Sequence, residues 1–413
     1  MSSFATPFAH LYPAFAGGFL LSYFFRSVNA VISPDLTREL ALKPASLGLL
    51  TSAYFIAFAA LQIPAGMLLD RYGPRRVEPA LLAIAGTGSL LFAIVSDVPS
   101  LAVARALIGA GCAASLMAPM KAIVTWYPVA RQPSLAGWMM VAGGVGALVA
   151  TTPLELALRV ASWRTIFIAL AALTYAAAAF IWLRVPEAPK HPETPGLALQ
   201  WAGVKSVFTH ARFWWIAPLG GVVMGTFMAI QGLWAVPWLI EVHGYDRAVA
   251  ARHLLVSGLS TLAGYTLIGM LAATLARLGI HARHLFAAGF TTSVAALAAI
   301  VGGLPASYLW WAIYGFGASV NVLSFTALND GFRKELAGRV NTAVNLIMFI
   351  GSFAVQWGVG LVVDGVHAAL GLDTAGGLRF AFAIALALNV APLAWFALGW
   401  RREGARPLAQ GKV

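Results

Sequence analysis

The sequence predicts an all-α integral membrane protein with twelve transmembrane helices. Hydrophobic residues make up 60% of the 413 residues, only 10% are charged, and the mean hydropathy is +0.81. This composition is far from that of an ordinary soluble domain. The chain also holds a series of apolar segments near the roughly 20 residues that a membrane-spanning helix needs. A charged run at 66–76 separates two of these segments and predicts a turn at the membrane surface.

Short connections separate the predicted spans. The first span begins close to Met1 and continues past any small-residue cleavage site, so we expect no removable signal peptide. A single cysteine, Cys112, excludes an intramolecular disulfide and a cysteine-based metal site. The predicted spans are 9–33, 46–69, 78–96, 99–123, 134–158, 164–184, 211–240, 248–276, 284–303, 305–328, 339–364 and 378–400.

The charge distribution predicts the orientation in the membrane. The run GMLLDRYGPRR (66–76) carries one acid and three arginines. Placing it in the cytoplasm puts most of the 27 Lys and Arg residues on that side, as the positive-inside rule requires. The net charge of +12 therefore reflects topology, and we expect no nucleic-acid partner. Both termini are predicted to be cytoplasmic, and the composition fits a bacterial inner membrane.

The chain divides into two halves. Residues 185–196 hold four prolines and few bulky apolar residues, which indicates a linker, and 197–208 read as an amphipathic helix on the membrane surface. A degraded copy of the charged run begins at Gly269, with Ala273 in place of the acid. This echo suggests duplicated halves with a site between them. The predicted units are bundle 1–184, linker 185–210, bundle 211–400 and tail 401–413.

Three motifs resemble the major facilitator superfamily. The run at 66–76 is similar to its signature loop G-x-L-x-D-R-x-G-x-R-R, and the SWRTIF segment at 162–167 also matches. Arg105, followed by Gly109 and Gly111, resembles the pattern of its fourth helix. The resemblance implies two six-helix bundles around a central cavity that opens alternately to each side of the membrane.

The same resemblance implies a gate at the signature loop. In this superfamily the loop acid typically pairs with a neighbouring helix end and helps to lock the outward-open state. Asp70 is the candidate gate residue, and the alternative is that it and the arginines anchor the loop at lipid headgroups. The candidate gating residues are Gly66, Asp70, Arg71, Gly73 and Arg75.

Two arginines within the spans are the candidate anion site. An arginine inside a membrane is costly, about 2.5–3.5 kcal/mol at a helix centre, so it usually faces protein, water or ligand. Arg26 shares a helix face with polar residues, among them Asn29, and Arg105 lies in another helix expected to line the cavity. Paired guanidinium groups suit a carboxylate or phosphate. The alternatives are that Arg26 pairs with Glu155 and that Arg105 organises the bundle.

A narrower resemblance points to organic anions. The segment 23–36 is similar to the first helix of the anion:cation symporter branch, and 104–113 resembles that branch's R-x-x-x-G-x-G-E-A pattern. Both arginines match, whereas Phe25 and Cys112 stand where the branch has Asp and Glu. The branch carries sugar acids and other carboxylates, often with protons. None of the 15 Asp and Glu residues lies near the middle of a predicted span, so we expect an anion site without the usual proton relay.

The second half offers amide and aromatic groups in place of charge. Pro237 is expected to bend the seventh span. The alternative for the buried amides is that they form hydrogen bonds between helices. The alternative for Trp234 is that it belongs to the aromatic belt at the membrane interface. The complete set of candidate substrate-binding residues is Arg26, Asn29, Tyr54, Arg105, Gln231, Trp234, Tyr314, Asn321 and Asn345.

The sequence therefore predicts a monomeric secondary transporter, active or facilitative, for a small organic carboxylate. The rival function is export of drugs or other amphiphiles by the same kind of protein, although 142–153 lacks the Gly-Pro pair typical of antiporters. A sensor is disfavoured because only 13 residues follow Trp400. We find no nucleotide-binding loop, metal cluster or nucleophile with a base, so we expect neither an enzyme nor a cofactor.

Overall fold

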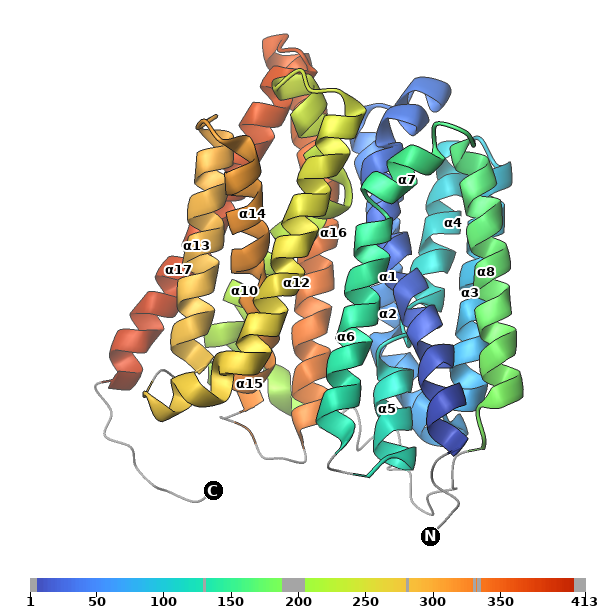
Figure 1. Ribbon diagram of the computed structural model, residues 1–413. Coiled ribbons are helices and arrows are strands. Elements are labelled where there is room, and N and C mark those ends of the chain that lie inside the picture. Colours follow the sequence, from blue (N-terminus) through green and yellow to red (C-terminus); the bar gives the residue numbers. More distant parts are fainter. Residues whose placement is uncertain are drawn as a thin grey trace.

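The computed structural model describes residues 6–128, 131–187, 205–279, 282–329, 332 and 336–404. These residues form two groups of helices that stand side by side, α1 to α8 and α10 to α17 (Figure 1). Helix α1 begins and α17 ends at the same end of the bundle, which we call the termini end. The other end is called the opposite end. The all-α membrane fold class is confirmed.

The first group follows the predicted spans closely. Its helices are α1 (Thr6–Leu40), α2 (Pro44–Tyr72), α3 (Pro74–Ile94), α4 (Val98–Gly111), α5 (Met117–Trp126), α6 (Gln132–Val149), α7 (Thr152–Ala157) and α8 (Trp163–Arg184). Helix α4 begins at an N-cap, Asp97, whose carboxylate accepts a hydrogen bond from the backbone N–H of Ser100. That bond holds the pKa of Asp97 below its ordinary value.

The second group begins beyond the linker. Its elements are α10 (Ala211–Ala229), η2 (Ile230–Trp234), α11 (Ala235–Pro237), η3 (Trp238–Val242), α12 (Arg247–Arg277), α13 (Ala282–Val301), α14 (Ser307–Ala318), η4 (Ser319–Asn321), α15 (Val322–Asn329), α16 (Ala337–Leu370) and α17 (Thr374–Gly404). Much of the predicted surface helix at 197–208 and of the tail at 401–413 lies outside the described residues.

Three predicted spans are interrupted helices. In the described part of the chain, nine helices are long and apolar enough to cross a membrane unbroken. The predicted spans 99–123, 134–158 and 305–328 correspond instead to α4 with α5, α6 with α7, and α14 with α15. Pro119 and Pro153 lie just after the first two breaks, where a proline cannot donate the hydrogen bond that would continue the helix.

The seventh span is also irregular. Two stretches of π-helix, η2 and η3, flank α11, which ends at Pro237. The wider turns accommodate the proline within one continuous rod instead of ending the helix. The structure therefore shows two π-turns around Pro237, and the bend expected there stays a prediction.

Glycines allow the helices of the first half to approach closely. A Cβ added at Gly109 on α4 would collide with the backbone of Tyr54 on α2, and one added at Gly111 would collide with the backbone of α3. These two positions set the spacing of α4 against α2 and α3. By contrast, a Cβ at Gly17 on α1 would meet nothing within 4 Å.

We expect Gly109→Val to destabilise the protein by about 1–3 kcal/mol or more, because α2 and α4 must separate to admit the side chain. The matched control is Gly17→Ala, which should be neutral or slightly stabilising because alanine favours a helix. Thermal unfolding of both variants in detergent checks this. Equal melting temperatures for Gly109→Val and the wild type would contradict the close packing.

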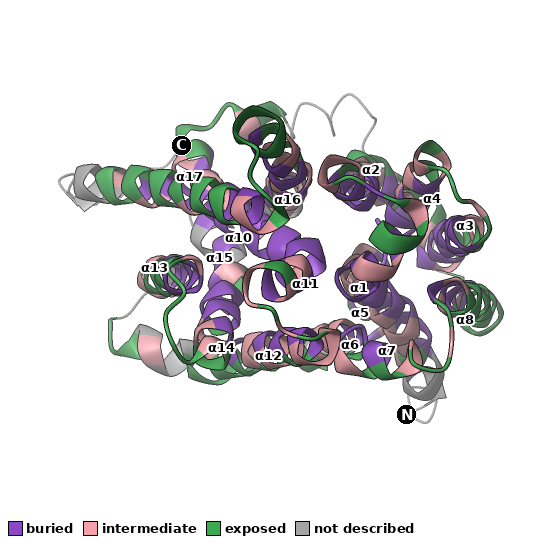
Figure 2. Ribbon diagram, turned by 90° about the horizontal axis from the view of Figure 1, so that it is seen from above, coloured by how far each residue is buried: buried purple, intermediate pink, exposed green. Residues whose placement is uncertain are grey.

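The two halves meet along several helix pairs. Helix α2 packs against α16, α1 against η2 and α11, and α6 with α7 against α12. Figure 2, seen from above, shows these neighbours along the line that separates the two groups. Residues at this boundary are therefore the ones that a motion of one half against the other would rearrange.

Candidate functional site

Arg26 lies at the boundary between the halves. Its guanidinium group stands 4.4 Å from the ring centre of Tyr23, 5.5 Å from that of Phe58 and 5.1 Å from that of Phe349. Tyr23 and Phe58 belong to the first half, whereas Phe349 lies on α16 of the second. Aromatic faces within about 6 Å attract a cation. The buried Nε atom has no hydrogen-bond partner, so the cation is surrounded by rings and its Nε–H donor is left for a ligand.

Arg105 is fully buried on α4. Its Nη1 atom donates a 3.0 Å hydrogen bond to the carbonyl oxygen of Phe25 on α1, and its guanidinium lies 5.2 Å from the ring centre of Tyr54. The Nε and Nη2 atoms have no partner. One edge of the guanidinium group therefore ties α4 to α1, in line with the alternative that Arg105 organises the bundle. The Nε and Nη2 donors are left unused.

Tyr54 joins the two arginines. Its side chain is fully buried on α2, its hydroxyl donates to the carbonyl oxygen of Ser22 over 3.4 Å, and it interacts electrostatically with both Arg26 and Arg105. The structure thus brings these three candidate residues together. Glu155 pairs with Arg159 at 3.0 Å, so it is not the partner of Arg26.

Asn29 faces α2 from the same stripe as Arg26. It is fully buried and its Nδ2 atom donates a 3.0 Å hydrogen bond to Thr51 Oγ1. Its Oδ1 atom has no partner. Asn29 therefore joins two helices of the first half, one turn from Arg26.

The candidates on the seventh span bond to neighbouring helices. The Nε2 atom of Gln231 donates to the carbonyl oxygen of Leu254 on α12 over 3.1 Å, and its buried Oε1 atom has no partner. Trp234 is buried, and its indole N–H donates to the carbonyl oxygen of Gln356 on α16 over 2.8 Å. Its ring also borders Gly48 on α2. In this conformation Trp234 packs where the halves meet.

The remaining candidates lie at different depths of the second half. Tyr314 is buried against Phe227, with its hydroxyl unpartnered, and Asn321 lies in η4 with an unpartnered Oδ1 atom. Asn345 is half-buried on α16. It lies four residues before Phe349, so the two share a helix face. The structure therefore places Asn345 one turn from a ring that contacts Arg26.

The signature loop is tied within the first half. Gly73 has φ of 76°, in the region that favours glycine, and connects α2 directly to α3. Asp70 accepts a 2.6 Å bond from Lys121 on α5, Arg75 donates to the carbonyl oxygen of Trp182, and Arg71 lies over the ring of Tyr72. Gly66 borders Met117. Asp70 thus pairs with a side chain from the middle of α5, within the same half.

The opposite end carries polar contacts between the halves. Arg247 on α12 bonds to Asp35 on α1 at 2.6 Å and donates to the carbonyl oxygen of Val31 over 2.7 Å. The backbone N–H of Ala45 on α2 donates to Asp364 on α16 over 3.0 Å. These three contacts join α1 and α2 to the second half, so the halves are held together at this end.

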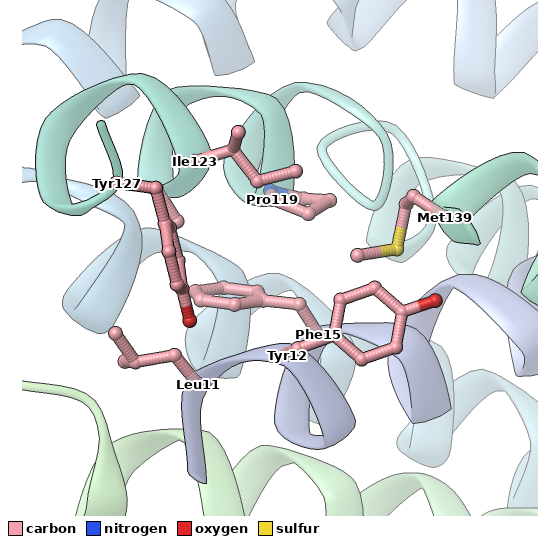
Figure 3. A pocket seen from close by; sticks show the side chains of 8 residues that line it. Leu11, Tyr12, Phe15, Pro119, Ile123, Tyr127 and Met139 are labelled. Carbon is pink, nitrogen blue, oxygen red and sulfur yellow. The ribbon is translucent and has the colours of Figure 1, made fainter. Parts of the chain in front are cut away.

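A small pocket lies apart from the arginines. Figure 3 shows it between α1, α5 and α6, toward the termini end. Its lining is apolar except for the hydroxyls of two tyrosines. The lining residues are Leu11, Tyr12, Phe15, Pro119, Ala122, Ile123, Tyr127 and Met139. It offers no charged group to an anion.

One buried acid contradicts the sequence-based inventory. Glu78 is 1% exposed, although the sequence placed it at the edge of a span and suggested no desolvated carboxyl. Helix α3 begins at Pro74, directly after the turn at Gly73, so Glu78 already lies one turn inside the packed bundle. The sequence also missed Phe58 and Phe349 beside Arg26. The spacing of Phe58 four residues after Tyr54 was the available signal.

The fold is a helical membrane bundle of two halves, and buried arginines lie near the boundary between them. Both features are typical of membrane transport proteins. Comparison with family models gives the family. Residues 15–356 match the model of the Major Facilitator Superfamily, and the chain belongs to this superfamily. It is therefore a multi-pass membrane protein of this transporter superfamily.

Similar curated proteins include several named for organic acids. A probable sulfoacetate transporter of Cupriavidus necator is 25% identical over 62% of this chain and 62% of its own length. The hexuronate transporter of Escherichia coli K12 is 26% identical over 55% of this chain and 56% of its own length. The galacturonate transporter of Dickeya chrysanthemi is 29% identical over 42% of this chain and 50% of its own. The matches thus span about half to three fifths of these relatives.

Solved structures share the fold. A bacterial homologue of the human lysosomal transporter Spinster, in an inward-facing and unoccupied conformation, superposes with a TM-score of 0.76 at 16% identity, over 98% of this chain and all of the other. The nucleoside transporter NupG superposes with a TM-score of 0.74 at 13% identity, over 94% of this chain and 99% of the other. At these identities the likeness concerns the fold alone.

Proposed function

We propose that this protein moves a small organic carboxylate across the bacterial inner membrane. The observation that carries this proposal is the convergence of Arg26 and Arg105 on Tyr54, with no carboxylate paired to either arginine among the described residues. A guanidinium group without an acid partner offers its charge and its N–H donors to an anion. The names of three relatives, sulfoacetate, hexuronate and galacturonate transporters, support an anionic substrate.

The second half is proposed to hold the rest of the substrate. Gln231, Tyr314 and Asn321 each keep an unpartnered polar atom, and Asn345 lies one helical turn from Phe349, whose ring contacts Arg26. Such groups suit the hydroxyls of a sugar acid or another polar body. Trp234 is proposed to act at the boundary between the halves, where its indole N–H bonds to α16.

Transport is proposed to proceed by alternating access between bundle 1–184 and bundle 211–400. With both termini in the cytoplasm, contacts such as Arg247 with Asp35 would hold the halves together on the outer side, and we propose that this conformation is closed there. The signature loop then acts from the cytoplasmic side. Gly66, Asp70, Arg71, Gly73 and Arg75 are proposed as its gating residues, with Asp70 bound to Lys121 in this conformation.

Coupling is proposed to differ from that of the symporter branch that the chain resembles. Phe25 and Cys112 occupy the two positions where that branch has acids, so the usual carboxylate relay is absent. An uncoupled monoanion would be driven outward by about 2.3 kcal/mol per 100 mV of inside-negative potential. Uptake therefore needs an opposing gradient, exchange, or a proton carried elsewhere.

A substrate screen in liposomes tests the proposed function. We expect purified protein to transport at least one of sulfoacetate, galacturonate and glucuronate saturably, under imposed potential and pH gradients. Empty liposomes and liposomes with heat-denatured protein are the controls. Transport of none of these anions would contradict the proposal.

Drug export is the second candidate. A cephamycin export protein of Amycolatopsis lactamdurans is 37% identical over 100 residues, 24% of this chain and 20% of its own length. Saturable transport of cephamycin or of a cationic drug in the same liposomes, without transport of the carboxylates, would favour this function.

A further inference from the structure

A buried carboxyl group lies between α3, α1 and the turn after α4. Glu78 is 1% exposed, and its Oε1 atom lies 3.5 Å from the position that a Cβ on Gly18 would occupy. Its Oε2 atom has no hydrogen-bond partner. The neighbouring polar side chain is the hydroxyl of Ser115. Across the described residues, Glu78 takes part in no ion pair.

This environment suits a neutral acid. Burying an ionised carboxylate is very costly unless a cation and several hydrogen bonds compensate it. Glu78 has neither, and the lack of a side chain at Gly18 leaves room for its carboxyl group against α1. A protonated carboxyl group carries an O–H donor, and the Ser115 hydroxyl can accept a hydrogen bond from it.

Polar side chains connect Glu78 to the arginine site. Glu78 interacts electrostatically with Cys112, and Cys112 interacts in turn with Ser22, Tyr54 and Arg26. Cys112 is the titratable group that the structure places against Glu78, and it stands where the resembled branch has a glutamate. A carboxyl is thus missing from α4 and present on the facing helix, α3.

We propose that Glu78 is the proton-binding site that couples transport, a conclusion that rests on the proposed carboxylate function. One proton binds to the carboxylate of Glu78 while one monoanion binds at Arg26 and Arg105. The pair crosses together with no net charge. On the inner side the anion leaves, and the O–H bond of Glu78 breaks and returns the proton to water.

The pocket in Figure 3 is lined in part by α1, the helix that faces Glu78 at Gly18. Phe15, one of its lining residues, lies three residues before Gly18 on α1. Pro119, another lining residue, lies four residues after Ser115. Both are about one helical turn nearer the termini end.

Infrared spectroscopy tests the protonation state without any substrate. In purified protein at neutral pH, we expect the C=O stretching band of a protonated carboxylic acid in the wild type and its loss in Glu78→Gln. Glu155→Gln is the matched control, because Glu155 is paired with Arg159 and should contribute no such band. Since glutamine is neutral and of similar shape, the variant should remain folded. A wild-type spectrum without the band, or a band that survives in Glu78→Gln, would overturn the proton site.

Transport in liposomes tests the coupling. With radiolabelled galacturonate and an inward proton gradient, we expect the wild type to accumulate the sugar acid above equilibrium. Glu78→Gln should lose this accumulation while keeping exchange of internal for external galacturonate, and Glu155→Gln should behave as the wild type.

The outcomes separate the two proposals. Gradient-driven accumulation by Glu78→Gln at the wild-type level would refute Glu78 as the coupling site and leave the carboxylate function intact. If the wild type moves neither galacturonate nor sulfoacetate, the carboxylate function fails for these anions. The infrared band then decides alone whether Glu78 holds a proton.

Discussion

Replacing Arg26 with alanine should abolish carboxylate transport and leave the protein folded. Losing a buried charged partner of an anion costs about 2–5 kcal/mol of binding, so we expect uptake to fall at least about thirty-fold, since each 1.4 kcal/mol is tenfold. The fold should not suffer, because the Nε atom of Arg26 has no partner and the group bonds to no acid.

Uptake of galacturonate and the melting temperature of the same preparation check this prediction. Arg26→Lys is the informative companion, since it keeps the charge but lacks the planar fork, and it should recover only part of the activity. Arg38→Ala, at an exposed position on the same helix, should transport normally. Wild-type uptake by Arg26→Ala would remove Arg26 from the site, whereas loss of folding would show that the arginine is structural.

Helical periodicity identified the stripe around Arg26 but not what packs on it. Two polar side chains of that stripe bond within the first half, Asn29 to Thr51 and Ser33 to its own helix. The carbonyl oxygen of Ser22 accepts a hydrogen bond from the hydroxyl of Tyr54. The rings of Phe58 and Phe349 complete the surroundings of Arg26. Phe349 lies on α16, far away in the sequence, and no pattern within one helix predicts such a neighbour.

Local signals predicted the spans, and tertiary packing decided the exceptions. The signature loop was located by its charge and glycines, and Gly73 does make the turn. The ion pair of Asp70 with Lys121 on α5 was not predicted, because it joins residues far apart in the sequence. Glu78 was misjudged because depth was inferred from the length of the apolar run. The helix start at Pro74 and the packing of α1 over α3 bury it.

The contacts between the halves also depend on tertiary packing, so they could not be predicted from the sequence. Asp35 and Arg247 lie near helix ends, where charged residues are ordinary. Only the arrangement of the two halves brings Arg247 onto α1 and Asp364 onto the first turn of α2. These contacts set how the two halves are placed against each other and do not determine the fold of either half.

Replacing Arg247 with alanine should therefore shift the protein toward a conformation open at the opposite end. The side chain is 25% exposed, bonds to Asp35 at 2.6 Å and donates to the carbonyl oxygen of Val31 over 2.7 Å. Charged hydrogen bonds of this kind contribute about 1.5–3 kcal/mol each. Both bonds join one half to the other, so their loss should raise the ratio of open to closed molecules about tenfold or more.

Spin labels on the two halves measure this shift. Val160 and Leu370 are exposed at the opposite end, one in each half, and labels there in a Cys112→Ser background report the separation of the halves. Arg247→Ala should lengthen the distances between labels. Arg38→Ala is the matched control, because Arg38 also bonds to Asp35 but lies on the same helix, so its loss should leave the distances unchanged. Identical distance distributions in Arg247→Ala and the wild type would show that this ion pair does not hold the halves together.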